Sequence, residues 1–165
     1  MVSVTFQGEP VTLNGEQVKV GDKAPNFILL SNTLEEMTLA DYKGQTKLIS
    51  VVPSLDTEVC SLQTKRFNEE ATKLAAKVLT VSMDLPFAQS RWCGLEGIDH
   101  VQTLSDHRLA DFGTKYGVLI EELRLLTRAI FVINEDDIVT YVEYVDEVTN
   151  HPNYERVLQH LNENE

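Results

Sequence analysis

The sequence predicts an α/β fold in which helices flank a central mixed β-sheet and an extra β-hairpin precedes the sheet at the N-terminus. Short β-branched runs alternate with segments whose apolar residues recur at helical spacing, which is typical of sheets built from strand–helix–strand units. An Asn-Gly pair near the N-terminus is a strong local hairpin signal. The 165 residues show no internal repeat or linker, so we expect a single domain over residues 1–165.

Residues 1–20 are predicted to form the hairpin extension. Asn14 and Gly15 tolerate the positive φ angles of a type I′ turn, and residues 11–20 carry apolar side chains on both sides of this pair. Residues 2–6 are expected to add a further strand to the hairpin.

The rest of the chain is predicted to alternate between strands and helices. We expect strands at residues 27–30, 48–52, 78–83 and 101–104, followed by a hairpin of strands 129–133 and 138–145. We expect helices after Thr57, at residues 87–96 and 109–116, and after Pro152. This order fits a thioredoxin-like fold, whose functional site would lie where the parallel strands end.

Cys60 is the candidate reactive residue, because it falls in the first turn of a predicted helix. Pro53 ends the preceding strand, since proline has no N–H for a central ladder. If Thr57 is the N-cap, Cys60 is at position N3, where the Thr57 hydroxyl can approach its amide or sulfur and the helix dipole favours a thiolate. Asp56 and Glu58 oppose this, because nearby carboxylates raise a thiol pKa, so a cation must come from elsewhere. The alternative is an inert core cysteine.

Cys93 is the second of two cysteines and lies 33 positions after Cys60. The chain has neither a Cys-x-x-Cys pair nor the cysteine density of a secreted disulfide scaffold. A bridge between the two would contribute roughly 4 kcal/mol on the chain-entropy model if it fitted without strain. Taken alone, the position of Cys93, beside Trp92 on the apolar side of a short helix, favours a structural thiol.

Arg128 is the best candidate for the missing cation. It immediately precedes the apolar strand 129–133 and can point its guanidinium across the end of the sheet. The alternative is a surface arginine that pairs with Glu121 or Glu122, and Arg124 is a weaker competitor for the same role.

Composition excludes several function classes. A formal net charge of −12 without a Lys/Arg cluster argues against binding nucleic acid or an anionic membrane. We find no run of membrane-spanning length and no basic flank ahead of an apolar N-terminal segment, and therefore expect a cytoplasmic protein. The four histidines lack the spacing of metal ligands, so no metal site is expected.

The spacing Pro53-x-x-x-Thr57-x-x-Cys60 resembles the active-site motif of peroxiredoxins. Longer phrases in the same order resemble the bacterial thiol peroxidases, an atypical two-cysteine group of that family; they cover residues 53–57, 81–89, 91–94 and 141–145. The resemblance extends over essentially all of the chain.

The resemblance implies that the Cys60 thiolate reduces hydrogen peroxide or organic hydroperoxides and becomes a sulfenic acid. It implies that Cys93 resolves this acid to an intramolecular disulfide, which thioredoxin then reduces. By the same resemblance Pro53 shields the pocket, Thr57 orients the peroxide and the sulfur, and Arg128 supplies positive charge. No prosthetic group is required, and a homodimer acting in antioxidant defence is expected.

Three other functions remain open from the residues. A thioredoxin-like disulfide reductase is disfavoured by the lack of Cys-x-x-Cys. A redox sensor would use the same reversible bridge without rapid turnover. A purely structural module would carry two inert thiols.

Overall fold

Seven strands form one mixed β-sheet, in the order β12-β11-β6-β7-β8-β4-β5, in a computed structural model that describes residues 3–163. The strands are β4 (Ile28–Leu30), β5 (Glu36–Thr38), β6 (Thr46–Val51), β7 (Ala76–Ser82), β8 (Gln102–Ser105), β11 (Ala129–Ile133) and β12 (Val139–Tyr144). The neighbours β6, β7 and β8 are parallel, and the other pairs are antiparallel. The predicted mixed sheet is therefore confirmed.

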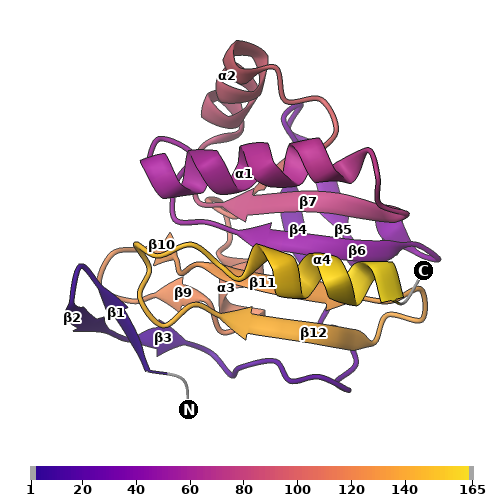
Figure 1. Cartoon of the computed structure of the whole chain (residues 1–165). Coiled ribbons are helices and arrows are strands. Elements are labelled where there is room, and N and C mark those ends of the chain that lie inside the picture. The colour runs from indigo at the N-terminus through magenta and orange to yellow at the C-terminus, as the bar shows by residue number, and fades with distance from the viewer. Residues whose placement is uncertain (1–2, 164–165) are drawn as a thin grey trace.

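Helices cover both faces of this sheet. Figure 1 shows α1 (Glu58–Ala71) and α4 (Tyr154–Glu163) side by side on one face, where Leu48 of β6 packs with Phe67 and Val157. Because side chains alternate along a strand, the neighbouring residues of β6 point to the opposite face.

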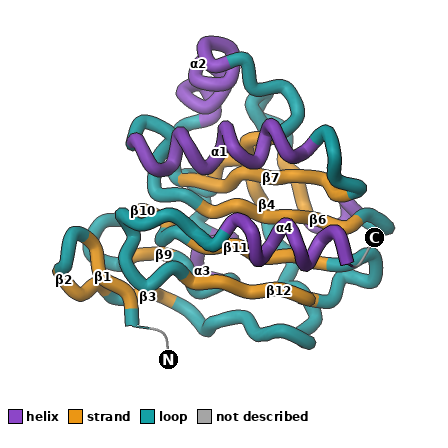
Figure 2. The backbone as a smooth tube through the Cα atoms, in the orientation of Figure 1, coloured by secondary structure: helices purple, strands orange, loops and turns teal. Residues whose placement is uncertain are grey.

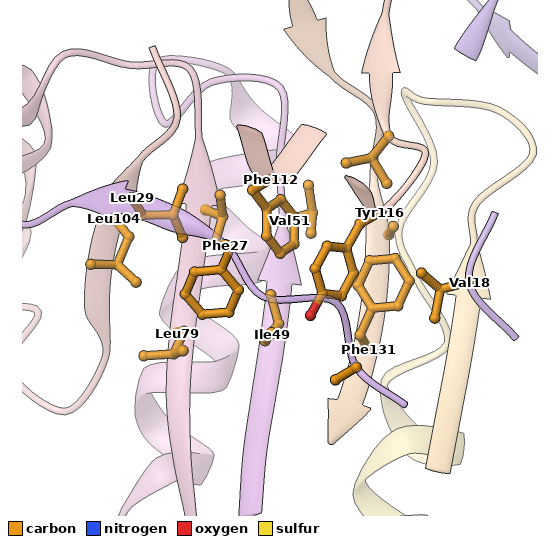
Figure 3. Close-up of a cluster of buried hydrophobic side chains, with 14 of the residues drawn as sticks. Val18, Phe27, Leu29, Ile49, Val51, Leu79, Leu104, Phe112, Tyr116 and Phe131 are labelled. Atoms are coloured by element: carbon orange, nitrogen blue, oxygen red, sulfur yellow. The ribbon is translucent and has the colours of Figure 1, made fainter. Parts of the chain in front are cut away.

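The opposite face carries the larger hydrophobic cluster, which packs under α3 (Asp111–Lys115). Ile49 and Val51 of β6 contribute to it. Figure 3 shows Val51 beside the ring of Phe112, and Ile49 between the rings of Phe27 and Tyr116. Several aromatic rings meet edge-on or stacked in this cluster: Phe27, Phe112, Tyr116 and Phe131. The β6 strand is thus buried on both faces, which makes its C-terminal end a rigid support for the loop that follows.

Helix α2 (Pro86–Glu96) stands apart from the two layers, at the top of the view in Figure 1 and Figure 2. Its buried residues are Pro86 and Gln89, whereas Phe87 and Leu95 are exposed. A segment with few buried apolar contacts is held only weakly by the rest of the fold. Helix α2 is therefore suited to local unfolding.

The N-terminal hairpin exists, but the prediction placed its turn at the wrong residues. Strands β1 (Val4–Phe6) and β2 (Glu9–Val11) are antiparallel and are joined at Gln7 and Gly8, whose φ angles are 51° and 83°. Both central residues therefore have the positive φ of a type I′ turn. Val2, at the start of the predicted strand, lies outside the described residues.

Asn14 and Gly15 serve a different purpose. Strand β3 (Leu13–Asn14) pairs with β9 (Leu119–Ile120), so the chain continues along another sheet instead of turning back on itself. Gly15 has a φ of 89°, and a Cβ there would lie 1.9 Å from the carbonyl oxygen of Thr114. Glycine is required at position 15 because another segment packs closely against its Cα, and not because the chain makes a hairpin turn there.

Short elements account for the other differences from prediction. The sequence did not predict β5, the 3₁₀ helix η1 (Leu39–Tyr42), β9 or β10 (Leu125–Leu126), because two to four residues carry too little periodicity. Strand β10 pairs with β9, and only Thr127 and Arg128 separate it from β11, which fixes the position of Arg128. Among residues 3–163 no helix is long and apolar enough to span a bilayer.

Candidate active site

Cys60 lies in the first turn of α1 and is fully buried. Strand β6 ends at Val51, Pro53 follows it, and Thr57 is the N-cap with extended backbone, so Cys60 occupies position N3. These predictions are confirmed. The sulfur therefore lies where the partial positive charge of a helix N-terminus favours an anion.

The Thr57 hydroxyl does not reach Cys60, which differs from the prediction. It donates a hydrogen bond to the carbonyl oxygen of Ser54 at 2.9 Å. Within the described residues its side chain makes no capping bond to α1, and its backbone carbonyl accepts the Ser61 N–H instead. The hydroxyl is used to close the turn that leads into the helix.

Arg128 supplies a guanidinium to the Cys60 sulfur. Its Nη2 donates to Cys60 Sγ at 3.3 Å, and the side chain is almost fully buried, with 2% exposed. Its Nε donates to the carbonyl oxygen of Val148 at 2.8 Å. The alternative of a surface arginine paired with a glutamate is wrong: Glu122 accepts the Thr12 N–H at 2.8 Å instead.

Arg124, the competitor for this position, is exposed. It has a positive φ of 54° in the turn between β9 and β10. Of the two arginines in this segment, the structure brings Arg128 to the buried sulfur.

Gln63 fixes the orientation of the guanidinium and was missed by the sequence analysis. Its Oε1 accepts from Arg128 Nη1 at 2.8 Å, and its Nε2 donates to Ser50 Oγ of β6 at 2.7 Å. Gln63 follows Cys60 by three residues, so the two side chains share one helix face. A buried amide on the inward face of a helix was the available signal, since such groups need specific partners.

A cavity of about 240 Å³ opens beside Arg128. Its lining is mostly apolar and comes from four parts of the chain. Besides Arg128, the lining residues are Phe6, Gln7, Pro53, Ser54, Thr57, Glu58, Val59, Leu125, Val148 and Thr149. Pro53 and Thr57, both predicted site residues, line it on the α1 side. The contribution of the N-terminal hairpin through Phe6 was not predicted, because it depends on packing between distant segments.

The hairpin is attached to the loop that positions Arg128. The Glu147 carboxylate accepts hydrogen bonds from Thr5 Oγ1 at 2.9 Å and from the Gly8 N–H at 2.8 Å. Two hydrogen bonds from Thr149, together with those from Gly8 and Thr5, lower the pKa of Glu147 to about 2, so its carboxyl group stays ionised at neutral pH. Because Val148 follows directly, this anchoring also fixes the carbonyl that orients Arg128.

Cys93 lies on α2, and its sulfur contacts Thr103 of β8. Its sulfur is 3.5 Å from Thr103 Oγ1, which in turn donates to Asn32 Oδ1 at 2.9 Å. Burial raises the pKa of the Cys93 thiol, and the hydrogen bonds with Thr103 and Asn32 partly offset this. Both cysteines are free thiols in this structure.

Trp92 stands between the two cysteine environments. It packs against the cluster formed by Val52, Leu55 and Cys60, while its neighbour Cys93 contacts Thr103. The structure therefore brings Pro53, Thr57 and Arg128 together around Cys60 and leaves Cys93 in a separate environment.

Comparisons with known proteins give a consistent family. The Redoxin family profile matches residues 19–158. The chain is 65% identical over 163 residues to a thiol peroxidase of Oceanobacillus iheyensis, covering 98% of this chain and 99% of that protein. It is 60% identical over 160 residues to a thiol peroxidase of Bacillus subtilis, covering 96% of each chain. A crystal structure of a peroxiredoxin-like protein from Aquifex aeolicus, 42% identical, superposes with a TM-score of 0.92 and covers 99% of this chain and 97% of that one. The chain therefore belongs to the Redoxin family, with its thioredoxin-like fold, and within it to the thiol peroxidases of the peroxiredoxin group.

Proposed function

We propose that this thiol peroxidase reduces hydrogen peroxide and organic hydroperoxides with the Cys60 thiolate. The contact between Arg128 Nη2 and Cys60 Sγ at a helix N-terminus carries the proposal, because it places a permanent cation on the sulfur beside an apolar cavity. The thiolate attacks the terminal peroxide oxygen, the O–O bond breaks, and the leaving hydroxide or alkoxide takes a proton from solvent. Cys60 becomes a sulfenic acid.

The neighbouring residues have matching roles in this proposal. Arg128 stabilises the charge that moves from sulfur to the leaving oxygen, since its donors are held in place before the reaction. Pro53 forms a wall that shields the sulfur from water. The Thr57 hydroxyl donates its hydrogen bond to the Ser54 carbonyl oxygen. The lone pairs of the Thr57 oxygen are therefore available to accept a hydrogen bond from the peroxide O–H.

The catalytic cycle is completed by Cys93. Its thiol condenses with the sulfenic acid to a Cys60–Cys93 disulfide, with loss of water, and thioredoxin restores both thiols in the cytoplasm. The sulfurs face different environments, so the first turn of α1 and helix α2 must open locally; the shallow burial of α2 supports this.

We further propose one domain over residues 1–165 and a homodimer in antioxidant defence, in which exposed apolar side chains such as Phe87 and Leu95 would be covered.

The disulfide route predicts a specific failure of Cys93→Ser. This variant should reduce one equivalent of peroxide and then stall with thioredoxin as reductant, because Cys60 sulfenic acid has no internal thiol to condense with. A small thiol should restore turnover. The measurement is thioredoxin-coupled peroxide consumption after a single-turnover burst. Sustained thioredoxin-driven turnover by Cys93→Ser would remove the resolving role of Cys93.

The cavity predicts that Phe6 contributes to organic hydroperoxide binding. Phe6→Ala should raise KM for cumene hydroperoxide by roughly 5- to 30-fold, the value of losing about 1–2 kcal/mol of apolar contact. The kcat/KM for hydrogen peroxide should stay unchanged, since this substrate is too small to reach the hairpin. Leu109→Ala, which removes an exposed apolar side chain outside the cavity, is the matched control. Equal changes for both peroxides would contradict this role.

A further inference from the structure

Asp84, a carboxylate outside the cavity, connects the turns that precede the two cysteine-bearing helices. It lies between β7 and α2, and its Oδ1 accepts from Ser54 Oγ at 2.7 Å. Its Oδ2 accepts from the Leu55 N–H at 2.8 Å and from Ser82 Oγ at 2.7 Å. Ser54 and Leu55 belong to the turn that leads into α1. We call these three bonds the Asp84 clamp.

The start of α2 is attached to the same point. Gln89 of α2 donates from Nε2 to Ser82 Oγ at 3.0 Å and to the Leu104 carbonyl at 2.9 Å. Ser105 Oγ donates to the Asp84 carbonyl oxygen at 2.5 Å. Gln89 is one of the two buried residues of α2, so the attachment of the helix to the sheet depends on this network.

Disulfide formation requires movement on both sides of the Asp84 clamp. Cys60 has to leave Arg128 and Cys93 has to leave Thr103 before the sulfurs can meet. Ser54 and Leu55 belong to the turn that leads into α1, so their bonds to Asp84, which are charge-assisted and therefore strong, would oppose unwinding of the first turn of the helix. The closed arrangement, with Cys60 beside Arg128, favours the reaction of Cys60 with peroxide. The open arrangement favours the reaction of Cys60 with the Cys93 thiol.

We propose that Asp84 is a positioning residue that holds the Cys60 site closed and sets how often it opens. This proposal rests on the proposed peroxidase function. It assigns opposite effects of Asp84 on two steps: the carboxylate accelerates the reaction of Cys60 with peroxide and slows the condensation with Cys93. A slower condensation also leaves the sulfenic acid exposed for longer to a second peroxide, which converts it to a sulfinic acid.

The first test needs no peroxide. Alkylation of Cys60 by iodoacetamide, followed by mass spectrometry of each cysteine, reports how often the site opens. The variant and the wild type are compared at the same pH, so a difference between their alkylation rates reports the access of iodoacetamide to the sulfur. Asp84→Asn keeps the shape of the side chain but removes the charge, and should raise the Cys60 rate about tenfold, equivalent to about 1.4 kcal/mol.

Asp111→Asn is the matched control. Its carboxylate also accepts a backbone N–H from another segment, that of Ile28 at 2.9 Å, but it bonds neither cysteine helix nor the turn before α1. The Cys60 alkylation rate of Asp111→Asn should equal that of the wild type. If Asp84→Asn fails to fold, Ser54→Ala removes one bond of the clamp and should give a smaller increase of the same sign.

The second test follows one equivalent of hydrogen peroxide by the fluorescence of Trp92, the single tryptophan, which packs against the Cys60 cluster. In Asp84→Asn, the fluorescence phase whose rate depends on peroxide concentration should become slower. The concentration-independent phase, which reports disulfide formation, should become about tenfold faster (~1.4 kcal/mol). More peroxide should then be needed to overoxidise Cys60 to a sulfinic acid. Unchanged alkylation and unchanged disulfide formation would overturn the role of Asp84, and so would both phases slowing together. If Cys60 of the wild type does not react with peroxide, the proposed function is wrong. The alkylation rates still test the role of the Asp84 clamp in that case.

Discussion

Replacing Cys60 with serine is expected to abolish thiol-dependent peroxide turnover, with a loss of more than about 10⁴-fold. A serine hydroxyl stays protonated at neutral pH, and the guanidinium of Arg128, 3.3 Å from the sulfur, cannot act as a base that removes its proton. The measurement is steady-state consumption of hydrogen peroxide and cumene hydroperoxide with a thioredoxin regenerating system.

Cys93→Ser is the natural companion to this variant, because it makes the same chemical change at the other cysteine. It should keep the first reduction of peroxide that Cys60→Ser loses. Turnover by Cys60→Ser at the wild-type rate would show that the buried thiol is not the reacting group.

Arg128→Gln is expected to lower kcat/KM for hydrogen peroxide by about 10²- to 10³-fold, the usual effect of removing a pre-positioned donor. The variant loses the charge beside Cys60 and leaves Gln63 Oε1 and the Val148 carbonyl without their donor. Buried unpaired acceptors cost about 1–3 kcal/mol, so the free energy of unfolding should fall as well. Peroxidase kinetics and urea denaturation measure the two effects.

Two further variants separate charge from geometry at this position. Arg128→Lys keeps the charge but not the planar fork that contacts three partners, and should recover only part of the activity. Arg124→Gln alters an exposed arginine four residues earlier and should match the wild type. An equal loss in Arg124→Gln and Arg128→Gln would point to a general electrostatic effect instead of a contact with Cys60.

Local sequence determined the position of Cys60 well. The proline that ends β6, the N-cap Thr57 and the three-residue spacing to Cys60 are properties of one short segment, so no distant contact decides them. Arg128 was also predictable, because a residue just before an apolar central strand must lie at the end of the sheet. The sequence did not predict that the guanidinium would be fully buried.

The residues that were missed depend on distant segments. Gln63 acts through Arg128 and Ser50, and Phe6 reaches the cavity because Thr5 and Gly8 bond to Glu147. No local propensity encodes such pairings, although buried amides on helix faces give a partial signal.

The hairpin turn shows how tertiary contacts override a local preference. Asn14-Gly15 is the better type I′ pair, yet the chain turns at Gln7-Gly8, because β3 gains a partner in β9 and Gly15 packs against Thr114. For Cys93, spacing left both a structural and a resolving thiol open, and the reduced structure places its sulfur beside Thr103. The pairing with Cys60 thus stays a prediction until the oxidised protein is measured.

Mixing the reduced protein with one equivalent of hydrogen peroxide, without reductant, tests the central claim most directly. Free-thiol titration and intact mass should show rapid loss of both thiols and a mass decrease of about 2 Da, as a disulfide forms from two cysteines. Cys60→Ser should show neither. Two thiols that survive in the wild type, or that disappear no faster than free cysteine would, contradict the peroxidase and favour a structural module or a slow redox sensor.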